Sequence, residues 1–227
     1  MNAIWYEPSD NTLIVSGRHQ GVIKVTMENE LVWILAPHRG WEQAGPEGDG
    51  FDTSAFLLTA VDENGEPYPG AVQQGDENAE NFSWTWGQHT PMVLPNGNLF
   101  VFDNGRKCNF VDTDRYSRGV EYAIDEDAMT ITQVWQYGEE RGEEFYSQII
   151  SDVDYLPETG NRLIAPGVIN ASNTPPDQAL ITEVTHPGKE VVFEATINFA
   201  NLYGEVLGYQ DIAYRSERLP LYPPAAQ

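Results

Sequence analysis

The stretch MVLPNGNLFVF, residues 92–102, consists of two apolar runs on either side of a Pro-Asn-Gly-Asn turn. Pro, Asn and Gly favour the backbone conformations of tight turns, and short apolar runs between such turns are typical of β-strands. The same plan occurs around residues 4–15 and 153–165, and two further apolar runs follow each of the three hairpins. The chain therefore repeats a unit of four short antiparallel strands, which is typical of β-propeller blades.

This repeat predicts an all-β fold, a β-propeller of about three four-stranded blades that forms only part of a ring. A propeller needs about 4–8 blades to close around its axis, and the end blades of an incomplete ring would expose apolar faces. We therefore expect half of a propeller that lacks an N-terminal portion or pairs with another chain, and the first strand's position directly after Met1 fits this expectation. The predicted segments are blades at about 1–37, 84–138 and 150–198, an insertion loop at about 41–82, and a tail at about 205–227 that closes the ring.

Composition excludes several classes of function. The chain carries 35 Asp and Glu against 12 Lys and Arg, a formal net charge of −23, whereas nucleic-acid binding needs a basic face. Apolar runs of about 18 residues, which a membrane-spanning helix needs, are absent, as is a signal-peptide pattern. A single cysteine, Cys108, excludes an internal disulfide and a Cys-based zinc site. The acidic clusters lack the ligand spacing of a calcium loop, so we predict no metal and no cofactor.

The rare basic residues and the histidines gather on one face of the predicted propeller. We number the strands of a blade from the axis outward, and we call the face from which strand one enters the top. Arg18 and His19 then lie in a loop between a second and a third strand, and His38 and Arg39 follow the fourth strand of the first unit. His89 immediately precedes the innermost strand of the second unit. All five residues are expected at the top of the fold.

Such a cluster would attract anions in a strongly acidic protein. Neutral imidazole is also a competent nucleophile near pH 7, because its free pKa is about 6.5. Taken singly, each loop histidine is most often a surface or turn residue, and His186, which falls at the bottom face, is interpreted in this way. No Ser-His-Asp order, Gly-rich phosphate loop or metal-binding His pair is present. Transfer of a group from an anionic ester, hydrolysis of such an ester, and non-catalytic binding of an anion or a protein therefore all stay open.

Several longer motifs of the chain resemble the bacterial aryl sulfotransferases, or arylsulfate sulfotransferases. The matching stretches are WGQHTP (86–91), LPNGN (94–98), FDNG (102–105), SGRHQ (16–20), WILAPH (33–38), YSR (116–118) with VEY (120–122), and QVWQYGEERGEEFYS (133–147). The resemblance covers about residues 2–170 closely and the tail loosely. Because the family has a six-bladed propeller, the resemblance implies that this chain is its C-terminal half.

The resemblance also implies a reaction and the residues that perform it. The family moves a sulfuryl group from a phenolic sulfate ester donor to a phenolic acceptor by a ping-pong route through a sulfohistidine, without a nucleotide sulfate donor. In this sequence the Gln-His-Thr motif implies that His89 is the catalytic residue, and the Arg-His-Gln motif implies that His19 binds substrate. Arg39 is the nearest match to an arginine that binds substrate, and Arg18 is a second candidate. The family is usually exported to the periplasm, which is the compartment that the resemblance implies.

The sequence departs from the family pattern at one motif. It contains no His-His-Asp run, whereas the resemblance implies a further active-site histidine in such a run of the N-terminal half. We therefore expect no turnover by this chain alone unless the N-terminal half-propeller or a second copy of the chain supplies the rest. The alternative function is a non-catalytic propeller fragment that binds an anion or a protein partner.

Overall fold

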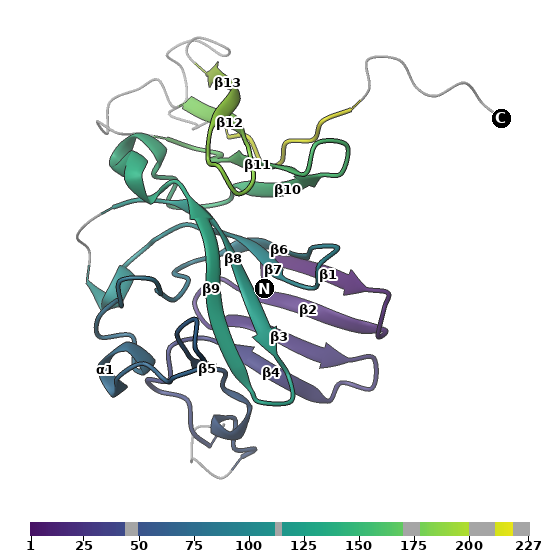
Figure 1. Cartoon of the computed structure of the whole chain (residues 1–227), viewed down its shortest axis with the longest axis vertical. Helices are drawn as coiled ribbons and strands as arrows, with labels where there is room; N and C mark the ends of the chain where they lie inside the picture. The colour runs from purple at the N-terminus through teal and green to yellow at the C-terminus, as the bar shows by residue number, and fades with distance from the viewer. Residues whose placement is uncertain (44–49, 112–114, 170–177, 200–211, 220–227) are drawn as a thin grey trace, which may run out of the picture.

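The computed structural model describes residues 1–43, 50–111, 115–169, 178–199 and 212–219, which form three β-sheets (Figure 1). The strand orders are β1-β2-β3-β4, β5-β9-β8-β7-β6 and β10-β11-β12-β13. Every neighbouring pair except β5–β9 is antiparallel, so the predicted all-β class is confirmed. The strands are β1 (Ala3–Glu7), β2 (Thr12–Gly17), β3 (Gly21–Thr26), β4 (Leu31–Leu35), β5 (Thr59–Ala60), β6 (His89–Val93), β7 (Leu99–Asp103), β8 (Arg118–Asp125), β9 (Thr130–Tyr137), β10 (Asp152–Leu156), β11 (Asn161–Ala165), β12 (Gln178–Val184) and β13 (Val191–Asn198).

The first hairpin of each sheet turns through a residue with a positive φ. These residues are Asn11 with φ 60°, Gly97 with φ 87° and Gly160 with φ 75°. Asn and Gly adopt the left-handed region at lower cost than other residues, which is why they are the usual turn residues. The turn chemistry that the sequence repeats therefore starts each of the three sheets.

The middle sheet packs between the other two. One apolar cluster joins the first and middle sheets, with Trp33 and Leu35 against Val101 and Tyr122. A second cluster joins the middle and third sheets, where Phe100 and other residues pack against β10–β12. The first strands of the three sheets are also neighbours, because β6 contacts both β1 and β10. The loops at the ends of these strands are consequently brought together.

The segment predicted as an insertion loop contains regular structure. It holds the 3-10 helix η1 (Ser54–Phe56), strand β5 and the short helix α1 (Gly70–Gln73). Strand β5 pairs in parallel with β9, so the middle sheet has five strands instead of the expected four. The buried Gln73 side chain stabilises this addition, because its amide accepts a hydrogen bond from Ala60 N at 2.9 Å and donates one to Ala60 O at 2.7 Å.

Apolar side chains are exposed on the outermost sheets. On β1, Ile4 and Tyr6 are each about half exposed, and they alternate with inward-facing Trp5. On β13, the run Val191–Phe193 is similarly exposed. The middle sheet is covered on both sides, whereas these two strands expose apolar surface that a further sheet could bury.

Part of the expected closing tail lies outside the described residues. Residues 212–219 are described, and they contain no strand. Three contacts place them on the third sheet: Ala213 N donates to Gly167 O, Ser216 N donates to Asp152, and Arg218 pairs with Glu183. The described part of the predicted closing tail therefore packs on the third sheet without forming a strand. Among the described residues, helices are too short or too polar to cross a membrane.

Candidate functional site

A cavity of about 420 Å³ lies where four loops meet, and it gathers positive charge. Four of the chain's twelve Lys and Arg line it, together with His19 and with the aromatic side chains Trp41, Trp86 and Phe110. Three predicted residues, Arg18, His19 and Arg39, are thus brought together. A cationic pocket with aromatic walls in a protein of net charge −23 is suited to an aromatic anion.

Arg106 and Lys107 complete the cationic lining, and the sequence interpretation missed them. They follow β7, in the loop between the second and third antiparallel strands of the middle sheet. Arg18 and His19 occupy the equivalent loop of the first sheet. Strand numbering predicted that Arg18 and His19 lie at the top of the fold. Applied to the loop after β7, it would also have predicted that Arg106 and Lys107 lie there.

Arg18 has a buried guanidinium N–H group without a hydrogen-bond acceptor. Its Nη2 donates to Gln148 O at 2.8 Å, while its Nε is buried and has no hydrogen-bond partner. A buried guanidinium N–H without an acceptor is costly. The Arg18 side chain lines the cavity, so this unsatisfied group lies at the edge of the candidate site.

Arg39 is better satisfied. Its guanidinium pairs with Asp76 and lies 4.5 Å from the centroid of the Phe110 ring. Its neighbour His38 turns away from the cavity, because Nε2 donates to Leu58 O at 2.9 Å and the ring packs on Trp84. The prediction that His38 joins the other basic residues and histidines is therefore wrong, because its side chain does not line the cavity. His186 contacts Trp135 and Glu121 elsewhere in the fold.

His89 begins β6 and is only 6% exposed. It is not itself part of the cavity lining, although the preceding residues Gly87 and Gln88 are. The register between β6 and β7 shifts after His89, and Thr90 has φ 45°. Bulges of this kind re-aim side chains at the ends of strands. The irregularity therefore sets the direction of His89 just behind the cavity wall.

Hydrogen bonds hold the segment before His89 on both sides. Gln88 O accepts from Ser16 Oγ at 3.2 Å and from Asn2 Nδ2 at 2.7 Å, and Gln88 Nε2 donates to Gly17 O at 3.0 Å. On the other side, Trp86 N donates to an Asp103 carboxylate oxygen at 2.7 Å. The histidine is thus fixed between the loops of the first and middle sheets.

The environment favours neutral imidazole. Burial lowers the pKa of His89, and the nearby Arg18 cation lowers it further, while hydrogen bonds to Asn104 and the Gly87 backbone oppose the shift. Burial, Arg18, Arg106 and Lys107 likewise lower the pKa of His19. Because both pKa values lie below the ordinary 6.5, both rings are predominantly neutral at pH 7.

Arg18 should therefore control the titration of both histidines. We expect Arg18→Gln to raise the pKa of His89 and of His19, because a like charge near each ring disappears. Histidine ring titrations followed by NMR would measure this. Arg141→Gln is the control, since Arg141 pairs with Glu194 on β13 and should leave both values unchanged. Unchanged pKa values in Arg18→Gln would contradict the electrostatic description of the site.

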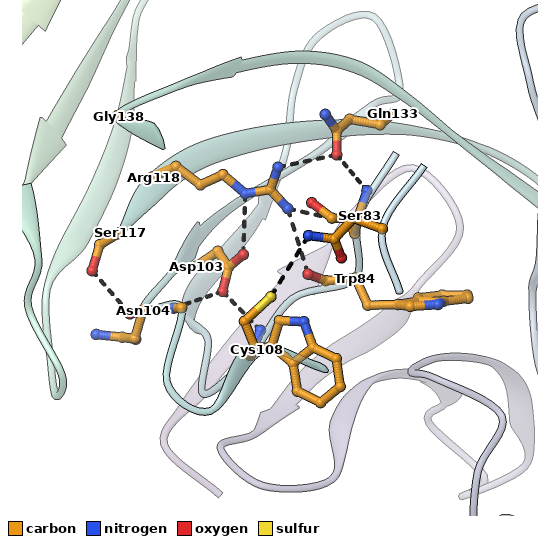
Figure 2. A network of polar contacts seen from close by, with 12 residues as sticks. Ser83, Trp84, Asp103, Asn104, Cys108, Ser117, Arg118, Gln133 and Gly138 are labelled. Atoms are coloured by element: carbon orange, nitrogen blue, oxygen red, sulfur yellow. Dashed lines mark hydrogen bonds and ion pairs between the residues drawn. The ribbon is translucent and has the colours of Figure 1, made fainter. Parts of the chain in front are cut away.

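A polar network built around a fully buried ion pair supports the loops behind the cavity (Figure 2). Arg118 Nε lies 3.1 Å from Asp103 Oδ2, and both side chains are inaccessible to solvent. Asp103 Oδ1 accepts the backbone N–H groups of Trp86 and Gly105. Arg118 also donates to Gln133 Oε1 and Ser83 O. This one ion pair therefore connects the loop that precedes His89 with the loop that follows β7.

Gly105 is required by the shape of that second loop. Its φ is 66°, and a Cβ added there would lie 1.9 Å from Tyr116 O.

Cys108 lies in the same loop and is buried, and burial raises the pKa of its thiol. Cys108 is thus a packed thiol rather than an activated nucleophile.

A second cavity, of about 470 Å³, has the opposite character. It lies along the first strands of the sheets and is lined by Asp152, Asp154 and Glu217, with Arg215 as its basic residue. Burial raises the pKa of Asp152 to about 6, against the hydrogen bond from Ser216 N and the charge of Arg215. An acidic cavity repels anions, so the first cavity is the candidate site. Within the described residues, no three His, Cys, Asp or Glu side chains gather as a metal site requires.

Asp152 makes the stability of the protein depend on pH. Its folded pKa of about 6 lies above the unfolded value, so the native state binds more protons between about pH 4 and 6. Stability should therefore fall as pH rises through this window, by about 2–3 kcal/mol. Urea unfolding at pH 4 and pH 7 should show that Asp152→Asn removes this decrease. The exposed Asp127→Asn should keep it, and equal pH dependence in wild type and Asp152→Asn would refute the assignment.

Comparison with known proteins shows the family. A sequence model of the family described as Arylsulfotransferase (ASST) matches residues 1–210. The arylsulfate sulfotransferase AssT of Escherichia coli O6:H1 (strain CFT073) is 36% identical over 202 residues, which are 87% of this chain and 32% of that protein. The arylsulfate sulfotransferase AssT of Lelliottia amnigena is 34% identical over the same shares of both chains. This chain, which spans about a third of the length of these relatives, therefore belongs to the arylsulfotransferase family.

Proposed function

We propose that this chain carries the sulfuryl-binding site and the nucleophile of an arylsulfate sulfotransferase. The observation that carries the proposal is the cationic, aromatic-walled cavity beside His89, a buried imidazole whose pKa is lowered. The proposed donor is a phenolic sulfate ester, in line with the name arylsulfate sulfotransferase that the relatives carry, and the proposed acceptor is a phenol. No nucleotide sulfate donor, metal or cofactor enters the proposed reaction.

The proposed reaction has two displacement steps. In the first, an imidazole nitrogen of His89 attacks the sulfur of the donor, an N–S bond forms, and the S–O bond to the phenol breaks. The phenolate leaves and takes a proton from water. In the second step the oxygen of the acceptor phenol attacks the sulfur, the N–S bond breaks, and the phenolic proton passes to solvent. His89 returns to its starting state, which is the ping-pong pattern of covalent catalysis.

The cavity residues fit the charges of this reaction. Sulfuryl oxygens carry negative charge throughout, and guanidinium groups are strong, directional donors to such oxygens. Arg18 has an unsatisfied buried Nε, and His19 and Arg39 line the same cavity. The aromatic walls Trp86 and Phe110 offer faces on which a phenol ring can stack.

A non-catalytic function remains the second candidate, and one observation favours it. His89 is only 6% exposed and does not line the cavity, so the cavity could bind an anion without any reaction at the imidazole. The two candidates differ at His89. A binding module would tolerate His89→Ala, whereas the transferase would lose its covalent step.

We further propose that the three sheets are blades of a six-bladed propeller, with blades at about 1–37, 84–138 and 150–198. The exposed apolar residues on β1 and β13 support this proposal, because adjoining blades would bury them. The partner is the remaining half-propeller of the relatives or a second copy of this chain, and complete turnover requires it. A periplasmic location is part of the same proposal.

Binding of 4-nitrophenyl sulfate tests the anion site directly. We expect calorimetry to show that Arg18→Gln weakens binding by about tenfold or more, because it removes a charge-assisted hydrogen bond. Arg39→Gln should have a smaller effect, since Asp76 already pairs with Arg39. Phenol, which is neutral at pH 7, is the control ligand and should bind both variants as it binds wild type. Equal affinity of wild type and Arg18→Gln for the sulfate ester would reject the site.

A further inference from the structure

His89 has one close side-chain partner, and that partner comes from the next strand. Its Nδ1 lies 2.6 Å from Asn104 Oδ1. Asn104 directly follows β7 and is fully buried. It belongs to the Phe-Asp-Asn-Gly motif, for which the proposed function assigns no role.

The surroundings of Asn104 determine which atom of its amide faces His89. Ser147 O lies 2.6 Å from one terminal atom of the Asn104 side-chain amide, and Ile150 O lies 3.0 Å from the same atom. Carbonyl oxygens only accept hydrogen bonds, so the atom between them must be the NH₂ group. The amide oxygen therefore faces His89. Because this oxygen accepts only, His89 Nδ1 must carry the hydrogen of the contact.

The position of Asn104 is fixed on every side. The backbone carbonyl of Asn104 accepts a hydrogen bond from Ser117 Oγ at 2.9 Å, a contact visible in Figure 2. Asp103 before it belongs to the buried ion pair, and Gly105 after it has the positive φ that the turn requires. Turning the amide over would face its NH₂ group towards His89 and leave Ser147 O and Ile150 O opposite an oxygen. The reversed orientation is therefore strongly disfavoured.

We infer that Asn104 is a positioning residue that holds His89 in the Nδ1–H tautomer, so that Nε2 carries the lone pair that attacks sulfur. The inference rests on the proposed function for the attack itself, whereas the tautomer rests on the 2.6 Å contact between Nδ1 and Asn104 Oδ1, against the weaker backbone contact of the ring to Gly87. Nε2 forms the N–S bond as the S–O bond of the ester breaks, and Nδ1 keeps its hydrogen in both steps. Asn104 Oδ1 stabilises the positive charge that the ring gains while it carries the sulfuryl group.

A neutral partner suits this role better than a carboxylate. An aspartate opposite Nδ1 would raise the pKa of His89 through its charge, and a protonated ring cannot attack. Asn104 fixes the same tautomer with a much smaller effect on the pKa. Together with burial and Arg18, it leaves His89 both oriented and neutral near pH 7.

NMR of the histidine-labelled full chain tests the tautomer without any need for activity. Long-range proton–nitrogen spectra distinguish the two neutral tautomers, and His89→Gln assigns the signal. We expect wild type to show the Nδ1–H form, whereas an unconstrained imidazole favours Nε2–H. Asn104→Leu, which removes the acceptor at similar volume, should shift His89 towards the Nε2–H form. Asn64→Leu is the matched control, because it makes the same substitution at an exposed position that does not contact His89.

A kinetic measurement separates positioning from binding. Asn104→Leu should slow sulfuryl transfer to His89 by about 10²-fold at saturating 4-nitrophenyl sulfate, because the attacking nitrogen is no longer aimed. Its dissociation constant for the ester should equal that of wild type, since Asn104 does not line the cavity. If Asn104→Leu fails to fold, the NMR measurement of the His89 tautomer in the wild-type chain is sufficient to test the inference.

The outcomes distinguish this inference from the proposed function. An Nε2–H tautomer in wild type overturns the inference, even where His89 takes up a sulfuryl group. The Nδ1–H tautomer without sulfuryl uptake supports the positioning of the ring and counts against the proposed reaction. A tautomer that stays unchanged in folded Asn104→Leu would also overturn the inference, because another group would then hold the ring.

Discussion

Replacing Asp103 with alanine is expected to lower the free energy of unfolding by about 3–5 kcal/mol, because it leaves Arg118 charged, buried and without its partner. Two buried backbone N–H groups, those of Trp86 and Gly105, lose their acceptor in the same variant. Small domains are stable by only about 5–15 kcal/mol, so this single change would remove a large share of the stability. Urea unfolding followed by tryptophan fluorescence would measure it.

Two further variants make this prediction specific. Asp103→Asn keeps an oxygen that can accept from Trp86 N but removes the charge, so its loss should be smaller than that of Asp103→Ala. Asp127→Ala changes an exposed aspartate and should alter stability by less than about 0.5 kcal/mol. A loss below about 1 kcal/mol for Asp103→Ala would contradict the role assigned to the buried ion pair.

Replacing His89 with alanine is expected to abolish the first chemical step. When wild type is mixed with excess 4-nitrophenyl sulfate, we expect a burst of 4-nitrophenol close to one equivalent per chain, because the sulfuryl group stays on the protein. Without the nucleophile the burst should disappear, with a rate loss on the order of 10³-fold or more. Absorbance in a stopped-flow experiment would record both results.

His38→Gln is the matched control for this variant. His38 belongs to the same sequence cluster, but its side chain bonds to Leu58 O and does not line the cavity. The burst should therefore survive in His38→Gln. A burst of equal size in His89→Ala would mean that another group attacks the ester, and a burst lost in both variants would point to damage of the fold.

The sequence predicted the strands well, because their signals are local. Each hairpin has its own apolar runs and a turn residue such as Gly97 or Gly160, and these fix strand and turn without reference to the rest of the chain. Strand β5 was missed for the opposite reason. Its two residues become a strand only because β9 offers an open edge and Gln73 brackets Ala60.

The same distinction applies to the site. Strand numbering alone was enough to place Arg18, His19 and Arg39 around one cavity. It could not show that the His38 side chain turns towards Leu58, because that depends on the residues of the insertion. The contact between His89 and Asn104 was equally beyond reach, since it joins residues 15 positions apart through the register of two strands.

The acidic cavity, unlike the cationic one, was not predicted from the sequence. A net charge of −23 predicts a negative surface but does not say where the positive charge collects. The two cavities described above differ in charge, with Arg and Lys around the first and Asp and Glu around the second. This separation gives a strongly acidic protein one place where an anionic ester is attracted.

The most direct test of the central claim is the mass of the intact chain after incubation with 4-nitrophenyl sulfate, followed by fragmentation to locate any added group. We expect a gain of one sulfuryl group, located on His89, because this chain alone should perform only the first step. The His89→Ala chain should show no gain. An unmodified wild-type chain, or a sulfuryl group on any other residue, would contradict the claim that His89 is the nucleophile and that this chain contains the sulfuryl site.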